Sequence, residues 1–290
     1  MRNEKFTDPI KNHRRREKGV LVYPVYSRRA GGLSVGINLF PDKKICSFNC
    51  PYCEVFPFST NAVFSAEQME EDLRAAIAEA RKQNIPVKDI CFSGNGEPSL
   101  SAFFPGVLER AALVRAETAP DAELVLITNG TGLQNEKIFA LLRDAAFSCR
   151  LDIWLKLDAG TCLWYQKMNR CEIPFEKHIK KIKEFAACAP VTIQTMLCAT
   201  DGGPPLDEEQ AWEDLILELV FAAGQNSTGA HIRKVQIYGK ARPSPQDPET
   251  SPLPECRLYE RAASLQKALS KAFGPGILPK NALPPVEIFP

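Results

Sequence analysis

The stretch "KKICSFNCPYCEVF" (residues 43–56) holds three cysteines, Cys46, Cys50 and Cys53, in the spacing C-x3-C-x2-C. Three thiolates within eight residues can wrap one metal centre, and both zinc and iron–sulfur clusters favour thiolate ligands. A structural zinc site is closed by four protein ligands. None of the three histidines of the chain is close to this segment in the sequence. The missing fourth ligand therefore favours an iron–sulfur cluster with one open iron, and zinc stays an alternative.

Predicted strands and helices alternate along the sequence, and the first strand precedes the cysteines. Short apolar segments rich in β-branched residues predict strands at 33–40, 87–94, 123–128, 151–157, 191–198 and 231–239. Amphipathic segments predict helices at 65–84, 104–118, 134–145, 175–185, 207–223 and 255–273. The first helix opens with a capping box, Ser65 and Gln68. Six strand–helix units predict an α/β fold, either a doubly wound sheet or a barrel.

Composition limits the class of protein. The chain has 290 residues and 44% hydrophobic residues, enough for a large core. Its first twenty residues lack the apolar region of a signal peptide, and no apolar run reaches membrane-spanning length. We expect a soluble, cytoplasmic protein that does not bind a membrane. In a reducing compartment its ten cysteines are metal ligands or buried thiols rather than a disulfide framework.

Charge is unevenly distributed. Residues 1–30 contain nine lysines and arginines and three acids, a net charge of +6, so the remaining 260 residues carry −5. A basic segment of this kind can bind the phosphate groups of RNA or of a cofactor, but a solvated tail is the simpler interpretation. We therefore divide the chain into a basic N-terminal extension (1–32), a core (33–242) and a C-terminal region (243–290). The last region comprises a Pro-rich strap, a helix and a tail extended over the surface.

Polar residues gather where the predicted strands end, which is where α/β proteins bind ligands. "SGNGEPSL" (93–100) follows the second strand, "TNGT" (128–131) the third and "KLDAG" (156–160) the fourth. Gln194 lies on the fifth strand, and Tyr238 to Arg242 end the sixth. Each has a plain structural reading as a turn, an ion pair or a core amide. Their agreement across separate segments favours a binding site, with Gln194 and Arg242 balanced between the two readings.

These motifs resemble those of a known family. C-x3-C-x2-C with an aromatic residue, Tyr52, before the last cysteine resembles the signature of the radical S-adenosylmethionine (radical SAM) superfamily. "GNGEP" (94–98) resembles the family's Gly-Gly-Glu motif, with Asn95 at the first glycine position and Gly96 and Glu97 retained. The resemblance covers about residues 33–242. It implies a partial (β/α)6 TIM-type barrel with parallel strands.

The resemblance also implies the cofactors and their ligands. Cys46, Cys50 and Cys53 would hold a [4Fe–4S] cluster whose open iron binds the amino and carboxylate groups of S-adenosylmethionine. The residues implied in binding S-adenosylmethionine are Tyr52, Gly94, Asn95, Gly96, Glu97, Asn129, Lys156, Asp158, Gln194 and Tyr238. A one-electron reductant such as flavodoxin or ferredoxin would drive reductive cleavage to a 5′-deoxyadenosyl radical, which abstracts hydrogen from a substrate.

The substrate is the least defined part of the prediction. Residues 36–55, "GINLFPDKKICSFNCPYCEV", resemble stand-alone radical SAM proteins related to the wyosine-type tRNA-modifying enzymes. The substrate is unassigned, with RNA or a protein as the candidates. One alternative is a glycyl-radical-type activase of a partner protein. Another is a non-enzymatic zinc- or cluster-bearing module that binds nucleic acid, with residues 1–30 as its phosphate-contacting arm.

Overall fold

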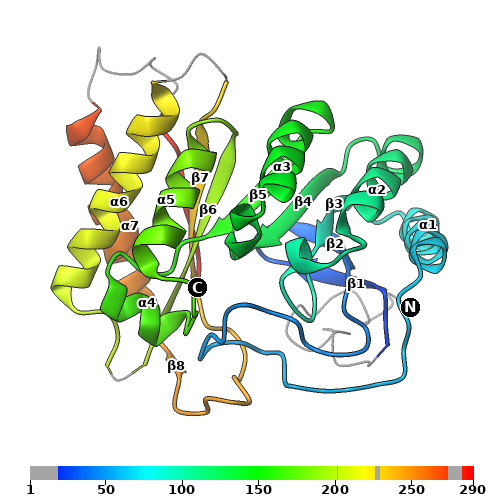
Figure 1. The fold of residues 1–290 in the computed structure, drawn as a ribbon, viewed down its shortest axis with the longest axis horizontal. Coiled ribbons are helices and arrows are strands. Elements are labelled where there is room, and N and C mark those ends of the chain that lie inside the picture. The colour runs from blue at the N-terminus through cyan, green and yellow to red at the C-terminus, as the bar shows by residue number, and fades with distance from the viewer. Residues whose placement is uncertain (1–18, 201, 226–228, 274–282) are drawn as a thin grey trace. The chain divides into compact units, whose positions relative to one another are not determined.

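The computed structural model describes residues 19–200, 202–225, 229–273 and 283–290 (Figure 1). The chain divides into two compact units. The first comprises Met1–Cys46, Val55–Thr128 and Ser148–Asp152, and the second comprises Ser47–Glu54, Asn129–Phe147 and Ile153–Pro290. The division passes through the cysteine segment, so that Cys46 belongs to the first unit and the other two cysteines to the second. Most of the basic segment predicted at 1–30 lies outside the described residues.

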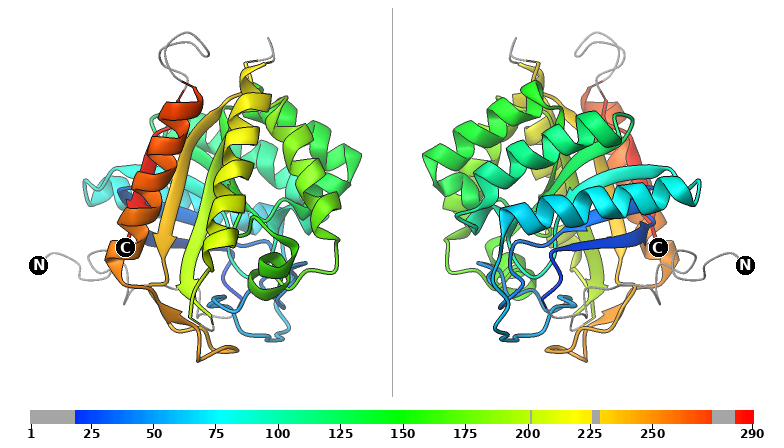
Figure 2. Two further views of the ribbon diagram at one scale, coloured as in Figure 1. Left: turned by 90° about the vertical axis from the view of Figure 1, so that its left-hand side faces the viewer. Right: turned by 90° about the vertical axis from the view of Figure 1, so that its right-hand side faces the viewer.

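The first unit is built on four neighbouring strands. They are β1 (Val22–Ser27), β2 (Gly32–Ile37), β3 (Val87–Phe92) and β4 (Glu123–Thr128), in that order. β1 is antiparallel to β2, whereas β2, β3 and β4 are parallel. The helices α1 (Ala66–Lys82) and α2 (Phe104–Thr118) pack against each other, and α1 also contacts β1 and β2 (Figure 2). The parallel order brings the segments that follow β2, β3 and β4 to one edge of this sheet.

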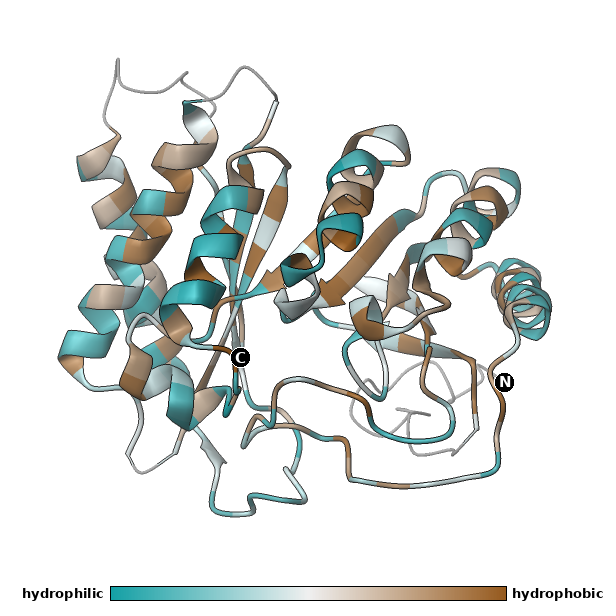
Figure 3. Cartoon of the chain, viewed as in Figure 1, coloured by the Kyte–Doolittle hydropathy of each residue, from teal (hydrophilic) through white to brown (hydrophobic). Residues whose placement is uncertain are grey.

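Helix α1 shows how the sequence sets the local structure. The Ser65 side chain accepts a hydrogen bond from the backbone N–H of Gln68 (3.2 Å), as the capping box predicts. The Gln68 side chain instead donates to Asp72 (3.0 Å), so only half of the box forms. Hydrophilic and hydrophobic residues are mixed along this helix (Figure 3). It buries an apolar stripe of Met69, Leu73, Ile77 and Ala80. That stripe at a period of 3.6 residues is what fixes the helix to the sheet.

The second unit is built on four further strands. They are β5 (Leu151–Lys156), β6 (Val191–Ala199), β7 (Ile232–Gly239) and β9 (Val286–Phe289), all parallel and in this order. A two-residue strand, β8 (Ser251–Pro252), pairs with β6 antiparallel. The helices of this unit are α3 (Glu136–Ser148), α4 (Cys162–Met168), α5 (Phe175–Ala186), α6 (Leu206–Gly224) and α7 (Glu255–Ala272). α6 and α7 lie side by side, and α7 contacts β7 and β9 (Figure 2).

Three elements depart from the sequence prediction. β1 pairs with β2 over all six residues, so part of the predicted N-terminal tail belongs to the sheet. The C-terminal "VEIF" was expected to extend over the surface, but it forms β9 beside β7. α4 was not predicted, because seven residues are too few to show a helical period. Strand pairing between distant segments carries no local sequence signal, which explains the other two differences.

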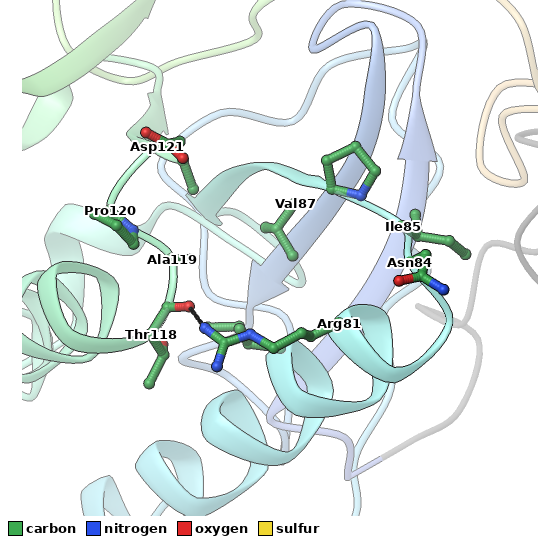
Figure 4. A pocket seen from close by; sticks show the side chains of 11 residues that line it. Arg81, Asn84, Ile85, Val87, Thr118, Ala119, Pro120 and Asp121 are labelled. Carbon is green, nitrogen blue, oxygen red and sulfur yellow. Dashed lines mark hydrogen bonds between the residues drawn. The ribbon is translucent and has the colours of Figure 1, made fainter.

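A shallow cavity of about 380 Å³ lies at the amino-terminal ends of β3 and β4 (Figure 4). It is lined by the last turns of α1 and α2 and the residues that follow them. At its edge, Arg81 donates a hydrogen bond to the carbonyl oxygen of Thr118 (2.5 Å). The predicted motifs follow the opposite, carboxyl-terminal ends of the strands. The cavity is therefore separate from them.

Across the described ranges, no helix is both long enough and apolar enough to span a membrane.

Candidate functional site

The GNGEP loop of the first unit is held by Asn38, which directly follows β2. The Asn38 side-chain oxygen accepts hydrogen bonds from the backbone N–H groups of Asn95 and Phe40, both at 3.2 Å. The Asn95 side chain donates back to the carbonyl oxygen of Phe40 (3.2 Å) and is 5% exposed. Gly94 has φ +128°, and a Cβ there would lie 2.7 Å from the Asn38 oxygen. Asn95 thus serves as a structural link at the position where the family motif has glycine.

Gly96 joins this loop to the start of the cysteine segment. It forms an isolated parallel bridge with Ile45, whose carbonyl oxygen accepts the backbone N–H of Glu97 (2.8 Å). A Cβ on Gly96 would lie only 1.9 Å from that oxygen. Glycine is required here by the close approach of two backbones. Cys46 comes directly after this contact, so the start of the cysteine motif meets the GNGEP loop within the first unit.

Glu97 is 2% exposed and its carboxylate is engaged locally. Its Oε1 accepts the Ser99 hydroxyl (2.5 Å), the Ser99 N–H (3.2 Å) and the Thr128 hydroxyl (2.6 Å). It thereby caps the short helix Pro98–Leu100 and ties the loop after β3 to the end of β4. Ser99 and Thr128 were not among the predicted site residues. Their position at strand ends is the signal by which they could have been found.

Residues 47–54, in the second unit, run without regular secondary structure and are held at several points. At their start, the Asn129 side chain donates to the Ser47 hydroxyl (3.0 Å), and Ser47 also bonds to the hydroxyl of Thr131 (2.5 Å). At their end, the two carboxylate oxygens of Glu54 accept hydrogen bonds from Nη1 of Arg242, at 2.9 and 3.2 Å. Asn129, predicted as a ligand of the cofactor, therefore fixes the cysteine segment itself.

The middle of this segment is held by Asn169 and Asp158. The Asn49 N–H donates to the carbonyl oxygen of Asn169 (2.9 Å), the residue that ends α4. The Asn169 amide donates to Oδ2 of Asp158 (3.0 Å), and the Tyr52 hydroxyl donates to the same oxygen. The other oxygen, Oδ1, accepts the backbone N–H of Met196 (2.9 Å). Asp158 has a fully buried side chain and connects four separate segments of this unit.

Lys156 lies between two tyrosine rings. Its ammonium is 4.9 Å from the Tyr52 ring centre and 5.1 Å from that of Tyr238, and it bonds to the Tyr238 hydroxyl. It is 3.8 Å from Asp158. Burial alone would lower the pKa of Lys156, but Asp158 and Tyr238 outweigh it and hold the pKa above its usual value. Lys156 is thus a fixed cation rather than an amine nucleophile, which needs a lowered pKa.

Tyr52 is held in its neutral form. Burial, followed by the charge of Asp158, raises the pKa of the phenol well above its usual value. The hydroxyl therefore stays a hydrogen-bond donor to the carboxylate. Lys156, Asp158, Tyr52 and Tyr238 form one connected group in the second unit, so four of the predicted site residues come together.

Gln194 has the contacts of a core amide. It is fully buried on β6, and its amide donates to the side-chain oxygen of Gln236 (2.7 Å). The Gln236 amide donates in turn to Glu287 of β9 (2.9 Å). These side chains lie in register with Lys156 across β5, β6, β7 and β9. Gln236 and Glu287 escaped prediction because the pairing with the C-terminal strand is not visible in the sequence.

The cysteine segment also contacts a group of aromatic side chains that the sequence did not predict. The Phe48 ring meets Tyr165 of α4 edge-on at 5.9 Å and His178 of α5 at 5.7 Å. Tyr165 and His178 stack at 5.6 Å. Burial lowers the pKa of His178 to about 4, so the imidazole is neutral at neutral pH. His178 is therefore a packing residue of this unit.

The three cysteines suit an iron–sulfur cluster by their chemistry. Cys50 is 8% exposed, while Cys46 and Cys53 are partly exposed. A turn closed by the Cys53 N–H and the Cys50 carbonyl oxygen (3.0 Å) brings two of the thiols from one short segment. Within the described residues, no three Cys, His, Asp or Glu side chains form a ready single-ion site. Soft thiolates on a loop with an adjoining glycine-rich backbone fit a cluster.

The family is shown by comparison with known proteins. The model of the Radical SAM superfamily matches residues 43–213, and this chain belongs to that superfamily. Members of this superfamily use a [4Fe–4S] cluster and S-adenosylmethionine, so the match confirms the predicted family and cofactors.

Two curated proteins are similar in sequence to part of this chain. A UPF0026 protein of Helicobacter pylori (strain J99) is 28% identical over 171 residues, which cover 57% of this chain and 50% of that protein. The GTPase Obg of Brachyspira hyodysenteriae is 27% identical over 167 residues, 56% of this chain and 22% of that protein. The chain thus spans half or less of the length of these two relatives.

Solved structures share the fold. A radical SAM methyltransferase from Sphaerobacter thermophilus has a TM-score of 0.60 at 14% identity, covering 92% of this chain and 69% of that one. A structure of TYW1 with a lysine-pyruvate adduct bound has a TM-score of 0.51 at 14% identity, covering 81% and 73%. The predicted fold class, an α/β partial barrel of mostly parallel strands, is confirmed.

Proposed function

We propose that this chain binds a [4Fe–4S] cluster through Cys46, Cys50 and Cys53 and cleaves S-adenosylmethionine reductively to abstract hydrogen from an RNA or protein substrate. The observation that carries the proposal is the family match over residues 43–213, together with the three cysteines of that segment. When bound, the cluster supplies the electron that breaks the carbon–sulfur bond of S-adenosylmethionine and yields a 5′-deoxyadenosyl radical.

The residues of the chain supply binding and orientation. In the first unit, the backbone from Gly94 to Glu97 is proposed to contact the methionine amino group. In the second unit, Tyr52 and Tyr238 are proposed to flank the adenine, and Lys156 is a fixed cation suited to the carboxylate. Asn129, Asp158 and Gln194, also proposed near the ribose, have protein partners that favour a supporting role. The reductant is proposed to be a flavodoxin or ferredoxin.

The test is anaerobic reconstitution of the full chain with iron and sulfide, followed by dithionite and S-adenosylmethionine. We expect release of 5′-deoxyadenosine. Deuterium transfer from labelled RNA or labelled protein into that product would then separate the two substrate classes. A reconstituted four-iron protein that releases only intact S-adenosylmethionine would contradict the proposal.

A further inference from the structure

Asn169, which directly follows α4, holds the cysteine segment on both sides of Cys50, directly at Asn49 and through Asp158 at Tyr52. The Asn169 carbonyl oxygen holds the Asn49 N–H directly (2.9 Å). The Asn169 amide holds Asp158 (3.0 Å), which in turn accepts the Tyr52 hydroxyl. Asn49 and Tyr52 flank the pair Cys50–Pro51. All of these groups lie within the second unit.

The carboxylate at the centre of this arrangement is occupied by the chain itself. Asp158 is 4% exposed and its side chain is fully buried. Its two oxygens accept from Met196, Asn169 and Tyr52, and Lys156 is 3.8 Å away. A buried carboxylate is costly unless it is fully hydrogen-bonded. These partners satisfy it without any cofactor group, which fits a fixed support better than a ligand-binding side chain.

We infer that Asp158 and Asn169 are positioning residues that set the conformation of residues 49–52 before the cluster binds. They act through Tyr52 and the backbone of Asn49, and so keep the Cys50 thiol in place. The advantage is preorganisation, since a loop that is already ordered loses less conformational entropy when its cysteines take up iron. The inference rests on the proposed function only where it concerns iron.

The hydrogen bond from the Asn169 amide to the Asp158 carboxylate has a fixed direction, which gives a specific test. Asn169→Asp would set two carboxylates against each other, and turning the side chain cannot relieve the repulsion. Adding Asp158→Asn restores one donor and one acceptor with the roles exchanged and leaves an oxygen for the Met196 N–H. The new amide no longer accepts the Tyr52 hydroxyl, but its second N–H can donate to the Tyr52 oxygen, so that contact is also kept with its roles exchanged. Gln166→Glu is the matched control, because it adds the same charge at an exposed position of α4, the helix that Asn169 follows.

The first measurement is amide hydrogen exchange at Asn49 and Cys53 in the iron-free full chain. We expect about tenfold faster exchange in Asn169→Asp, the scale of one lost hydrogen bond to a charged group. The double variant should return to within about threefold of the wild type, and Gln166→Glu should match the wild type. Melting temperatures of all four proteins identify any variant that fails to fold.

The second measurement is the rate of iron loss from the reconstituted proteins to a chelator. We expect Asn169→Asp to lose iron fastest, and the double variant and Gln166→Glu to lose it at rates close to that of the wild type. Unchanged exchange in Asn169→Asp, or a folded double variant that exchanges as fast as the single one, would overturn the inference. A wild-type protein that takes up no four-iron cluster would instead contradict the proposed function. The exchange experiment would still decide the role of Asp158 and Asn169.

Discussion

Gly96 lies against Ile45 so closely that a Cβ atom on Gly96 would be 1.9 Å from the Ile45 carbonyl oxygen. The loop after β3 and the residue before Cys46 therefore meet backbone to backbone. The Glu97 N–H closes the contact with a hydrogen bond of 2.8 Å to the same oxygen. Within the first unit, this contact links the GNGEP loop to the start of the cysteine motif, and it explains why the loop needs glycine at this position.

Gly96→Ala should destabilise the first unit by roughly 1–3 kcal/mol, the usual cost of inserting a methyl group where there is no room. The reason is steric contact alone, because Gly96 does not have a left-handed φ. Chemical denaturation would measure the loss. The iron content after reconstitution should fall as well, because the displaced backbone leads directly into Cys46.

Gly106→Ala is the matched control for that variant. Gly106 is in α2 and a Cβ there would meet nothing within 4 Å. Alanine in a helix is more stable than glycine by roughly 0.5–1 kcal/mol, so this variant should gain stability and keep its iron. Equal losses in the two variants would show that the Ile45 contact is not the cause.

Each of the three cysteines in the segment should be needed for the cluster. Cys46→Ala, Cys50→Ala and Cys53→Ala should each abolish the brown colour of the reconstituted protein and the release of 5′-deoxyadenosine. The fold should survive, because a core of this size does not depend on one metal centre. Cys256→Ala, at an exposed position of α7, should behave as the wild type. Full cleavage activity in Cys50→Ala would refute the assignment.

Asp89 should give the stability of the protein a measurable pH dependence. Burial, partly offset by the Ser34 hydroxyl, raises the pKa of Asp89 from 3.8 to about 6. The folded state then binds more protons than the unfolded state between about pH 4 and pH 6, so this carboxyl lowers stability as the pH rises through that range.

Asp89→Asn removes this titration and keeps an acceptor for Ser34. Relative to the wild type, the variant should gain roughly 2–3 kcal/mol of stability between pH 4 and pH 7. Urea denaturation at several pH values measures the difference. Asp121→Asn changes an exposed carboxyl and should give a pH profile parallel to the wild type. A flat difference between Asp89→Asn and the wild type would contradict the prediction.

Local patterns in the sequence predicted most of the elements. α2 and β4 have the predicted bounds, and α1 begins at the predicted cap, Ser65. β1 and β9 were missed because a strand is defined by its partner, and their partners lie outside the local pattern. The seven-residue helix α4 was missed because its fold depends on packing by Trp164, Tyr165 and Met168 rather than on a repeated period.

The candidate site was predictable to a similar degree. Strand ends correctly placed the GNGEP loop beside the start of the cysteine segment. They also brought Lys156, Asp158 and Tyr238 together with Tyr52. Asn169 could not be found in this way, because it ends a helix that the sequence did not reveal. Residue type at a strand end predicts location, whereas the partner of each polar atom depends on tertiary packing.

The remaining cysteines should not form a second cluster. Cys162 is exposed at the start of α4, whereas Cys171 and Cys198 are buried at 4% and 1% exposure. Burial raises the pKa of Cys198 to about 12, which keeps it a thiol rather than a thiolate ligand.

Reconstitution should therefore give about four irons and four sulfides for each chain. The double variant Cys162→Ala/Cys171→Ala should keep that content, because the cluster depends on the C-x3-C-x2-C segment alone. Iron and sulfide analysis after gel filtration measures both proteins. A content near eight irons in the wild type that falls to about four in the double variant would reveal a second cluster at the end of β5.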